Sequence, residues 1–452
     1  MGLSPPVAER LDSRRLPGTS LLWDRPSAVI DASVSEGDAA RVIDAWSLQA
    51  RRMLDAVGWA GEALIARAFH GGLSVAMSAP IDALYAATEV NEWAWDAGLR
   101  ALGGAPPSDA DVAEAAALLM PLIAAERRPR LLELEAAAAA HGVALVFDDQ
   151  RAGVGLGAGS VTWSLDDIPA VADIGWDSVR DVPLALVTGT NGKTTTARML
   201  GAMIAACGLV PGISTTDGVR VGPENIATGD YSGPEGARLA LRDRRVQVAV
   251  LETARGGILR RGLTVRRADA ALVTNVADDH MGEFGVHDLD ALVQVKMVVG
   301  RVVTPQGRLI LNADDPMLVA AAATPTSLAA LAWFSLDAHS PTLLACVASG
   351  GDAAFLRDGS LVLVRSGRES VICSVADIPA TLRGAARYNV ANALGAILLG
   401  ASLGLSEQSL REGLRSFNSS PQANPGRLNI FELNGATLLV DFAQTRMASP
   451  RS

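Results

Sequence analysis

The residues most able to do chemistry lie in one stretch, LALVTGTNGKTTTARML, which spans residues 184–200. An apolar strand leads there into a turn bounded by Gly189 and Gly192, and Lys193 and Thr194 begin the helix that follows. Such a loop aims backbone N–H groups at an anion, the helix adds the positive end of its dipole, the lysine adds a charge, and a hydroxyl can reach Mg²⁺. The pattern predicts a phosphate-binding loop. The alternative, a glycine turn with an exposed lysine, fits the flanking strand and helix less well.

A mostly parallel sheet, covered by helices on both faces, is expected to hold this loop, because residues 181–424 repeat strand then helix. Ligands in such sheets bind beyond the carboxyl ends of the strands. Polar segments follow three of the expected strands: the loop itself after residues 184–187, ETARGG after residues 246–251 and NVADDH after residues 270–274. Together these strand ends predict a nucleotide site.

Three side chains near these ends are candidates for holding a metal ion. Glu252 directly follows the apolar run VQVAVL, where it can help to hold a Mg²⁺ that bridges nucleotide phosphates, with Thr194 on the other side of the ion; a structural glutamate is the alternative. His280 lies beside two aspartates, six places past a strand end, as a metal ligand or as a structural histidine. Lys296 lies in a largely apolar helix, so its ammonium needs an anion or a modification unless it snorkels to the surface.

The residues before the loop are expected to form a smaller, mixed α/β domain. A strand is predicted at residues 28–32 and helices at residues 38–56 and 130–140. Another helix should begin near Ser108, because Ser108 and Asp111 have the spacing of a capping box. We find no catalytic constellation in this part of the sequence.

Length, net charge and cysteine usage limit the number of domains, the kinds of partner and the cellular compartment. A chain of 452 residues has room for two or three domains, and a formal net charge of −10 argues against a broad nucleic-acid or anionic-membrane surface. The longest apolar runs are too short to span a bilayer, and no signal peptide begins the chain, so we expect a cytoplasmic protein. Cys207, Cys346 and Cys373 lack metal-ligand spacing and are expected to be small core residues.

The loop is shorter than the general nucleoside-triphosphatase pattern, because Val187 stands where that pattern has its first glycine. The compressed GTNGKTTT resembles the Mur ligase superfamily, whose members join a carboxylic acid to an amine at the expense of ATP. The strings TTDGVRVG, TGDYSGPEGARLALRD, VAVLETARGGILRRGL and VTNVADDHMGEFG are most similar to the Mur-ligase half of the cyanophycin synthetases, which adds arginine to an aspartate side chain. The resemblance covers residues 182–443.

The resemblance implies roles for individual residues. Asn389 and Asn392 match the asparagines that flank adenine, and Lys296 matches a lysine that many Mur ligases carbamylate to help bind a second Mg²⁺. ATP and Mg²⁺ are the implied cofactors. The nucleotide-binding residues would be Gly189, Thr190, Asn191, Gly192, Lys193, Thr194, Thr195, Asn389, Asn392, Arg427 and Asp441; the metal ligands Thr194, Glu252, His280 and Lys296; and the catalytic residues Lys193, His280 and Lys296.

The implied reaction is ATP-dependent ligation of an acid to an amino acid. In that superfamily the acid's carboxylate attacks the γ-phosphate, which gives an acyl phosphate and ADP, and the amine then displaces phosphate. The expected partners are therefore a small-molecule acid and an amino acid, with neither nucleic acid nor membrane. The alternatives are an inactive ATP-binding module that acts through partners and, less favoured by the shortened loop, a kinase or mechanical ATPase.

The sequence also departs from the family pattern at both ends. We expect an N-terminal domain over residues 1–178, the ATP-binding domain over residues 179–425 and the start of a truncated C-terminal domain over residues 426–452. The N-terminal region is too short for the complete ATP-grasp module of cyanophycin synthetases, and the family's His-Asn step does not follow Asp441. We therefore expect the chain to bind Mg-ATP weakly and to ligate poorly alone.

Overall fold

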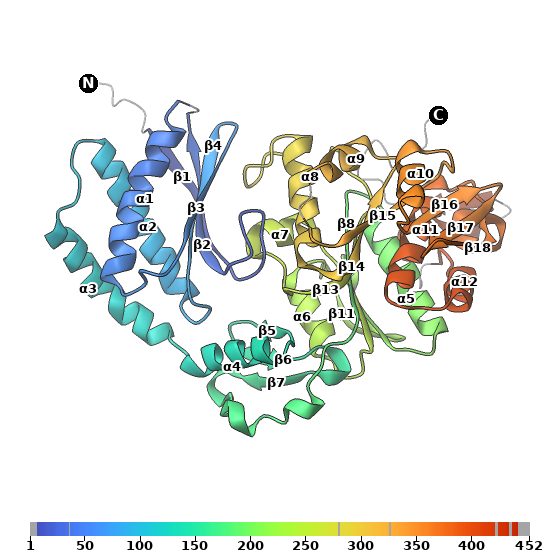
Figure 1. Cartoon of the computed structure of the whole chain (residues 1–452), viewed down its shortest axis with the longest axis horizontal. Helices are drawn as coiled ribbons and strands as arrows, with labels where there is room; N and C mark the ends of the chain where they lie inside the picture. Colours follow the sequence, from blue (N-terminus) through green and yellow to red (C-terminus); the bar gives the residue numbers. More distant parts are fainter. Residues whose placement is uncertain are drawn as a thin grey trace.

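The computed structural model describes residues 7–441, apart from Glu36 and residues 279–280, 325–326, 421–423 and 434–435. Figure 1 shows an N-terminal unit of sheet and helices at one end, a small unit beneath, and a large α/β unit that carries the rest of the chain. The segment that contains the glycine loop lies in the large unit.

The N-terminal unit is an antiparallel four-stranded sheet in the order β1-β2-β4-β3, with helices against it. Its elements are β1 (Ala8–Leu16), β2 (Ser27–Val34), α1 (Ala39–Ala56), β3 (Leu64–Phe69), β4 (Gly72–Ser78), α2 (Leu84–Leu102) and α3 (Asp109–Glu126). The predicted strand and helix at its start are confirmed by β2 and α1. The capping box is confirmed as well: the Asp111 N–H donates to Ser108 Oγ over 3.2 Å, and the Ser108 N–H donates to Asp111 Oδ2 over 2.7 Å.

A second, smaller unit follows with a hydrophobic cluster of its own. Its elements are α4 (Pro129–Ala140), β5 (Leu145–Phe147), β6 (Arg151–Val154) and β7 (Val161–Ser164), and the three strands form one antiparallel sheet. The predicted helix over residues 130–140 is confirmed by α4. The cluster of this unit is separate from the larger cluster built on α1 and α2, although both lie in the region predicted as one N-terminal domain.

The large unit is built on one sheet of eleven strands in the order β11-β10-β9-β12-β8-β13-β14-β15-β16-β17-β18. From β9 to β16 neighbouring strands are parallel, and the two edges are antiparallel. The strands are β8 (Leu184–Thr188), β9 (Pro211–Thr215), β10 (Gly218–Val221), β11 (Glu224–Thr228), β12 (Val248–Glu252), β13 (Ala268–Val273), β14 (Val303–Asn312), β15 (Ala330–Ser335), β16 (Ala353–Arg357), β17 (Ser360–Arg365) and β18 (Arg368–Ser374).

Helices cover both faces of this sheet, which confirms the predicted fold class. In β8, Leu184 and Leu186 pack into one hydrophobic cluster while Ala185 and Val187 pack into another on the opposite face, so the strand is apolar throughout. The helices are α5 (Lys193–Ala206), α6 (Pro234–Arg242), α7 (Arg255–Arg261), α8 (Leu289–Met297), α9 (Pro316–Ala322), α10 (Pro341–Ala348), α11 (Arg387–Ser402) and α12 (Glu407–Ser416). The β8 and β12 ends point toward the same edge because these strands are parallel neighbours.

The N-terminal sheet packs against the large unit near α7 and α8. Arg14 Nε donates to the Leu259 carbonyl over 3.0 Å, and the Leu263 N–H donates to the Thr19 carbonyl over 2.8 Å. The Phe69 ring lies 5.8 Å from the His287 ring, between centroids. The N-terminal unit therefore supports the segment that leads into α8.

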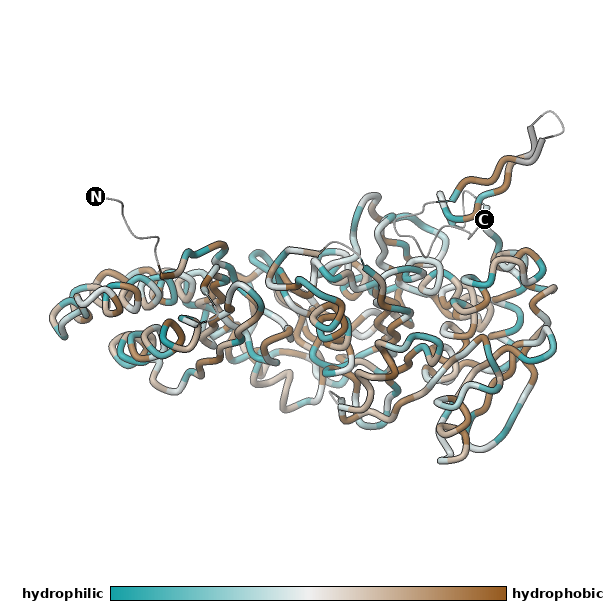
Figure 2. Tube along the Cα trace, turned by 90° about the horizontal axis from the view of Figure 1, so that it is seen from above, coloured by the Kyte–Doolittle hydropathy of each residue, from teal (hydrophilic) through white to brown (hydrophobic). Residues whose placement is uncertain are grey.

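A two-stranded hairpin, β19 (Asn429–Leu433) and β20 (Ala436–Val440), ends the described part of the chain. Figure 2 shows it extending from the body near the C-terminal mark, with hydrophobic residues along it, and Phe431 and Leu439 are indeed exposed. Among the described residues, no helix is both long and apolar enough to cross a membrane.

One sequence expectation is wrong in this fold. The three cysteines were expected in the core, but only Cys373 is buried, while Cys346 is half-buried and Cys207 is exposed. Cys207 is the C-cap of α5, which ends at Ala206, so it lies just beyond the helix.

Candidate functional site

The loop between β8 and α5 is a tightly packed turn that only glycine can form at two positions. Gly189 has a φ of 141° and Gly192 a φ of 85°, both in the region that disfavours residues with a side chain. A Cβ on Gly189 would lie 1.8 Å from Thr274 Oγ1, and one on Gly192 would lie 2.2 Å from Asn392 Oδ1. Lys193 then begins α5, with Gly192 as its N-cap, so the loop leads directly into a helix N-terminus.

The end of β13 holds this loop in shape through hydrogen bonds. The Thr190 N–H donates to the Asn275 carbonyl over 2.9 Å, and the Asn191 N–H donates to Asn275 Oδ1 over 2.9 Å. Thr274 Oγ1 in turn donates to the Asn191 carbonyl over 2.6 Å. Because these contacts are made within the protein, the loop is organised without a ligand, which lowers the cost of ordering it on binding.

The Lys193 ammonium folds back over the loop and donates to the Thr190 carbonyl over 2.9 Å. The side chain is only half-buried. A full positive charge therefore lies at the loop and at the N-terminus of α5, where both favour a bound anion.

A buried carboxylate lies directly beside the first turn of α5. Glu252, at the end of β12, is 2% exposed, and its Oε2 accepts from Thr194 Oγ1 over 2.7 Å and from the Thr216 N–H over 3.3 Å. Its other oxygen, Oε1, is buried without a hydrogen-bond partner among the described residues. Burial raises the pKa of this carboxyl, and the nearby Lys193 charge and the Thr194 hydrogen bond partly offset that effect.

This arrangement fits a hard divalent cation. A buried carboxylate oxygen that lacks a partner is costly, and Mg²⁺ takes one or two protein oxygens while its other positions go to water and phosphate. Thr194 Oγ1 lies next to the carboxylate, so a hydroxyl and a carboxylate can serve the same ion. Among the described residues, no group of three or more His, Cys, Asp and Glu side chains is gathered to hold a metal by protein ligands alone.

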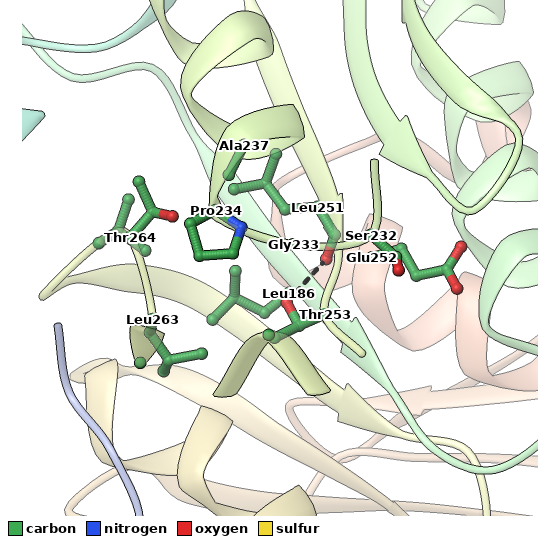
Figure 3. Close-up of a pocket in the computed structure, with 13 residues that line it drawn as sticks. Leu186, Ser232, Gly233, Pro234, Ala237, Leu251, Glu252, Thr253, Leu263 and Thr264 are labelled. Carbon is green, nitrogen blue, oxygen red and sulfur yellow. Dashed lines mark hydrogen bonds between the residues drawn. The ribbon is translucent and has the colours of Figure 1, made fainter. Parts of the chain in front are cut away.

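A small cavity lies next to Glu252. It measures about 20 Å³ and lies between the N-terminus of α6, the end of β12 and the residues that follow α7. Figure 3 shows Ser232 and Gly233 on one wall, Leu263 on another and Glu252 at the edge. The space is about that of one water molecule.

Arg427, in the segment before β19, contacts the Thr194 hydroxyl. Arg427 Nη2 donates to Thr194 Oγ1 and Thr216 Oγ1, each over 3.2 Å. Its Nη1 lies 2.7 Å from Asp217 Oδ2, which also pairs with Arg198 Nη2 at 2.9 Å. Burial lowers the pKa of Arg198 to about 10. A chain of ion pairs thus links α5 to the segment that precedes the hairpin.

The asparagines of α11 lie on the other side of the loop. Asn392 approaches Gly192 through Oδ1 and donates from Nδ2 to Asn389 Oδ1 over 3.1 Å. Asn389 donates to the Ala380 carbonyl over 2.7 Å, so it supports Asn392 from behind. Asn424 Nδ2 donates to Thr195 Oγ1 over 3.4 Å and ties the next segment to α5. Contact of either α11 asparagine with an adenine ring stays a prediction.

Asp441, at the end of the hairpin, anchors that element rather than reaching the loop. Its Oδ1 accepts from the Leu428 N–H over 3.1 Å and its Oδ2 from the Tyr388 hydroxyl over 3.0 Å. Burial of Tyr388, together with the Asp441 charge, raises the pKa of that phenol.

Of the two residues expected near a second metal ion, only one is described. Lys296 lies on α8 and is 1% exposed, which confirms the expectation that its side chain is buried. His280 lies outside the described residues, so its predicted role as a ligand, and that of Lys296 beside it, stay predictions.

The Mur ligase middle domain family matches residues 187–400. This part of the chain is therefore similar to a Mur ligase middle domain. The match begins inside β8 and ends inside α11, so it contains the loop, Glu252 and both α11 asparagines.

The curated proteins that this chain resembles are named as synthetases and ligases. Cyanophycin synthetase from Nostoc sp. is 42% identical over 262 residues, which cover 58% of this chain and 29% of that protein. Cyanophycin synthetase from Synechocystis sp. is 40% identical, with 58% and 30% covered. UDP-N-acetylmuramoyl-L-alanyl-D-glutamate–2,6-diaminopimelate ligase from Geobacter metallireducens is 28% identical, with 58% and 50% covered. The chain thus matches less than a third of the length of the cyanophycin synthetases.

Solved structures resemble the fold more distantly. A structure of UDP-N-acetylmuramoyl-L-alanyl-D-glutamate–2,6-diaminopimelate ligase has 20% identity and a TM-score of 0.45, and the match covers 60% of this chain and 53% of that one. A bifunctional folylpolyglutamate synthase/dihydrofolate synthase has 20% identity and a TM-score of 0.41, with 59% and 64% covered.

The site also contains contributors that the sequence analysis missed. Thr216 and Asp217 lie beside α5, where Thr216 contacts Thr194 and Asp217 pairs with Arg198, and Asn275 shapes the loop backbone. Asn275 could have been found, because it directly follows a predicted strand end. The other three gave no comparable signal, since pairing within the sheet and ion pairs across the site bring them together.

Proposed function

We propose that this chain is an ATP-dependent acid–amino-acid ligase of the cyanophycin-synthetase-like Mur type, with residues 179–425 as its ATP-binding domain. The observation that supports this most is the Glu252 carboxylate. It is buried beside Thr194 at the start of a preformed glycine loop, with one oxygen left without a partner. The names of the relatives, which are synthetases and ligases, supply the reaction class.

In this proposal the loop and Lys193 bind the phosphates of ATP. The loop N–H groups, the N-terminus of α5 and the ammonium all favour the charge that develops on a transferring phosphoryl group. Thr194 and Glu252 would hold Mg²⁺, and bound Mg²⁺ would spread that charge further. His280 and Lys296 would hold a second ion, with Lys296 in carbamylated form. Gly189 and Gly192 let the loop backbone approach the phosphates closely.

The remaining predicted residues would position the nucleotide. Asn389 and Asn392 lie beyond Gly192, where a base could stack, and Thr190, Asn191 and Thr195 complete the loop and the first turn of α5. Arg427 would contact phosphate from the side of Thr194, and Asp441 would hold the following hairpin in place. The substrates would be an acid and an amino acid whose carboxylate and amine meet at the γ-phosphate end of the site.

The experiment measures nucleotide chemistry on the purified full chain with Mg-ATP. ADP and phosphate release are followed with an aspartate-containing peptide, with arginine, and with both, and the amide product is sought by mass spectrometry. The expected result is slow phosphate release that rises when both substrates are present, together with a small yield of an amide of the expected mass, because the chain alone is expected to ligate poorly. Binding without turnover would favour an inactive module, and phosphate on a stable acceptor without amide would favour a kinase; either result would overturn the proposal. Lys193→Ala is the control for contaminating ATPases.

A further inference from the structure

The outer face of α3 is apolar although nothing in the described chain covers it. The helix buries Val112, Ala116, Leu119 and Ile123 against the N-terminal unit, at the spacing of one helical face. Figure 1 shows α3 along the outer edge of that unit. A helix at such an edge normally carries charged side chains along its whole solvent side, whereas α3 carries them only near its ends.

The exposed side chains of α3 form a continuous apolar stripe. Leu118 is 71% exposed and Leu122 50% exposed, and Met120 is more than half exposed as well. Between Glu114 and Glu126 the helix carries no charged residue. A helix that is hydrophobic on all sides belongs in an interior or an interface, because exposed apolar patches of this kind mark sites of association.

Small residues along the stripe leave room for a second helix to pack closely. Ala117, Pro121 and Ala125 are exposed and lie four residues apart, so they form one row along the helix surface. Large side chains at Leu118 and Leu122 lie beside this row. Rows of this spacing form the ridges and grooves by which two helices interdigitate, and small residues let their backbones approach closely.

The charges at the two ends of α3 favour one particular partner. The N-terminal end carries Asp109, Asp111 and Glu114, whereas Arg127, Arg128 and Arg130 follow its C-terminal end. The Asp109 side chain is fully exposed while it pairs with Arg52 at 2.7 Å, and that of Arg130 is 53% exposed while it pairs with Glu133 at 2.8 Å, so both remain open to solvent and to a second copy. An antiparallel copy of the same helix places the acidic end of each copy against the basic end of the other.

We propose that α3 is a self-association surface, through which two copies of this chain form an antiparallel, two-fold symmetric dimer. A two-fold interface requires a surface that complements itself, and a stripe with opposite charges at its ends meets that requirement. With the axis near Leu119, Asp109 of one copy faces Arg130 of the second copy. A single helix face is a small interface, so a dissociation constant on the order of 10 µM is expected. This inference is independent of the proposed ligase activity.

Sedimentation velocity over a concentration series tests the dimer on the full chain. Wild type should pass from its monomer mass of 46.8 kDa to twice that mass as concentration rises. The double variant Leu118→Glu/Leu122→Glu should raise the dissociation constant about tenfold or more, since it buries charge in the interface. The matched control is Leu344→Glu on α10, where the leucine is equally exposed at 50% but lies in the large unit. It should leave the dissociation constant unchanged.

A charge swap tests the antiparallel arrangement. Asp109→Arg or Arg130→Glu alone should each weaken the dimer a few-fold, because like charges then face each other across the interface, and the two together should restore it. Neither residue is in the core, so folding is not at risk, and circular dichroism checks this. A chain that stays monomeric at about 200 µM would overturn the proposal, as would a dimer that the double leucine variant leaves intact. Failure of the paired charge variant to recover would overturn the antiparallel geometry.

Discussion

Two buried carboxylates, one in each main part of the molecule, have opposite surroundings. Asp31, on β2 of the N-terminal sheet, is 3% exposed; its Oδ2 accepts from Arg14 Nη1 over 2.6 Å and its Oδ1 from Ser74 Oγ over 2.5 Å. Glu252, at the end of β12, is equally buried, but one of its oxygens has no hydrogen-bond partner among the described residues. Asp31 is fully paired within the fold, and Glu252 is not.

The difference separates a structural charge from one that is suited to a ligand. The free-energy cost of burying a carboxylate is offset within the fold when both of its oxygens accept hydrogen bonds, as they do in Asp31. On the elements next to the loop, further polar atoms are buried without partners among the described residues, namely Thr188 Oγ1, Thr196 Oγ1 and Asn424 Oδ1. Polar groups left open around one loop indicate a site where something else completes the bonding, which is the basis of the proposed nucleotide site.

The largest effect is expected from removing the charge at the loop. Lys193→Ala should lower ATP-dependent ADP formation by about 10²–10³-fold, which is the usual cost of losing one group that stabilises developing negative charge. The melting temperature should change little, because Lys193 is half-buried and its ammonium donates to a backbone carbonyl, that of Thr190, as its one hydrogen bond within the described part of the chain. Steady-state ADP release and thermal melting of the same sample measure both quantities. Full activity in this variant would remove the loop from the proposed chemistry.

Asp31→Asn should lower the stability of the fold and leave nucleotide binding unchanged. The substitution leaves the Arg14 guanidinium, whose side chain is 10% exposed, with only Asp12 as an acidic partner, so unfolding should become easier by about 3 kcal/mol. Urea denaturation followed by tryptophan fluorescence gives the change. Nucleotide affinity at a temperature where the variant is folded should equal that of wild type. A large loss of nucleotide affinity with unchanged stability would contradict the structural role assigned to Asp31.

Glu252→Gln tests the open oxygen itself. The amide keeps the size of the side chain and can still accept from Thr194, but it removes the charge that would attract Mg²⁺. We expect Mg²⁺-dependent nucleotide affinity to fall about 10–100-fold, comparable to the loss of other groups that support a bound metal. Metal-free nucleotide binding should be retained, since the loop N–H groups and Lys193 remain. Isothermal titration with and without Mg²⁺ separates the two, and equal losses in both titrations would argue against a metal role.

The sequence predicted those parts of the fold and site that depend on local pattern. The glycine loop, the strand ends and the capping box at Ser108 follow from residue types at fixed spacing, and the structure has all of them. Burial of Lys296 was also predictable, because its helix is apolar on most sides. Exposure of Cys207 was not, because helix packing alone decides which side of the last turn faces solvent.

Long-range pairing accounts for what the sequence did not predict. The placement of Thr216 and Asp217 beside Thr194 depends on the parallel pairing of β9 with β12, two strands that lie dozens of residues apart in the sequence. The same holds for Arg198, whose ion pair to Asp217 joins α5 to a turn that no motif connects to it. Spacing along the chain carries no signal for such contacts.

The smallest expected effect concerns the pH dependence of stability without metal. Burial raises the pKa of Glu252 above its ordinary value of 4.5, so the folded protein holds this proton more tightly than the unfolded chain does. The group therefore favours the folded state below about pH 4.5, and that contribution is lost as the pH rises through the raised pKa. Glutamine does not titrate. The melting temperature of Glu252→Gln should thus match wild type at low pH and exceed it increasingly as the pH rises.

Added Mg²⁺ should shrink this difference, because a bound cation stabilises the charged carboxylate in wild type and has no charge to pair with in the variant. Asp31→Asn is the matched comparison, since it also removes one buried carboxylate. Its difference from wild type should not respond to Mg²⁺, because Arg14 and Ser74 already occupy both Asp31 oxygens. If Mg²⁺ changed the melting temperatures of both variants relative to wild type by the same amount, the two carboxylates would not differ in the way their surroundings indicate.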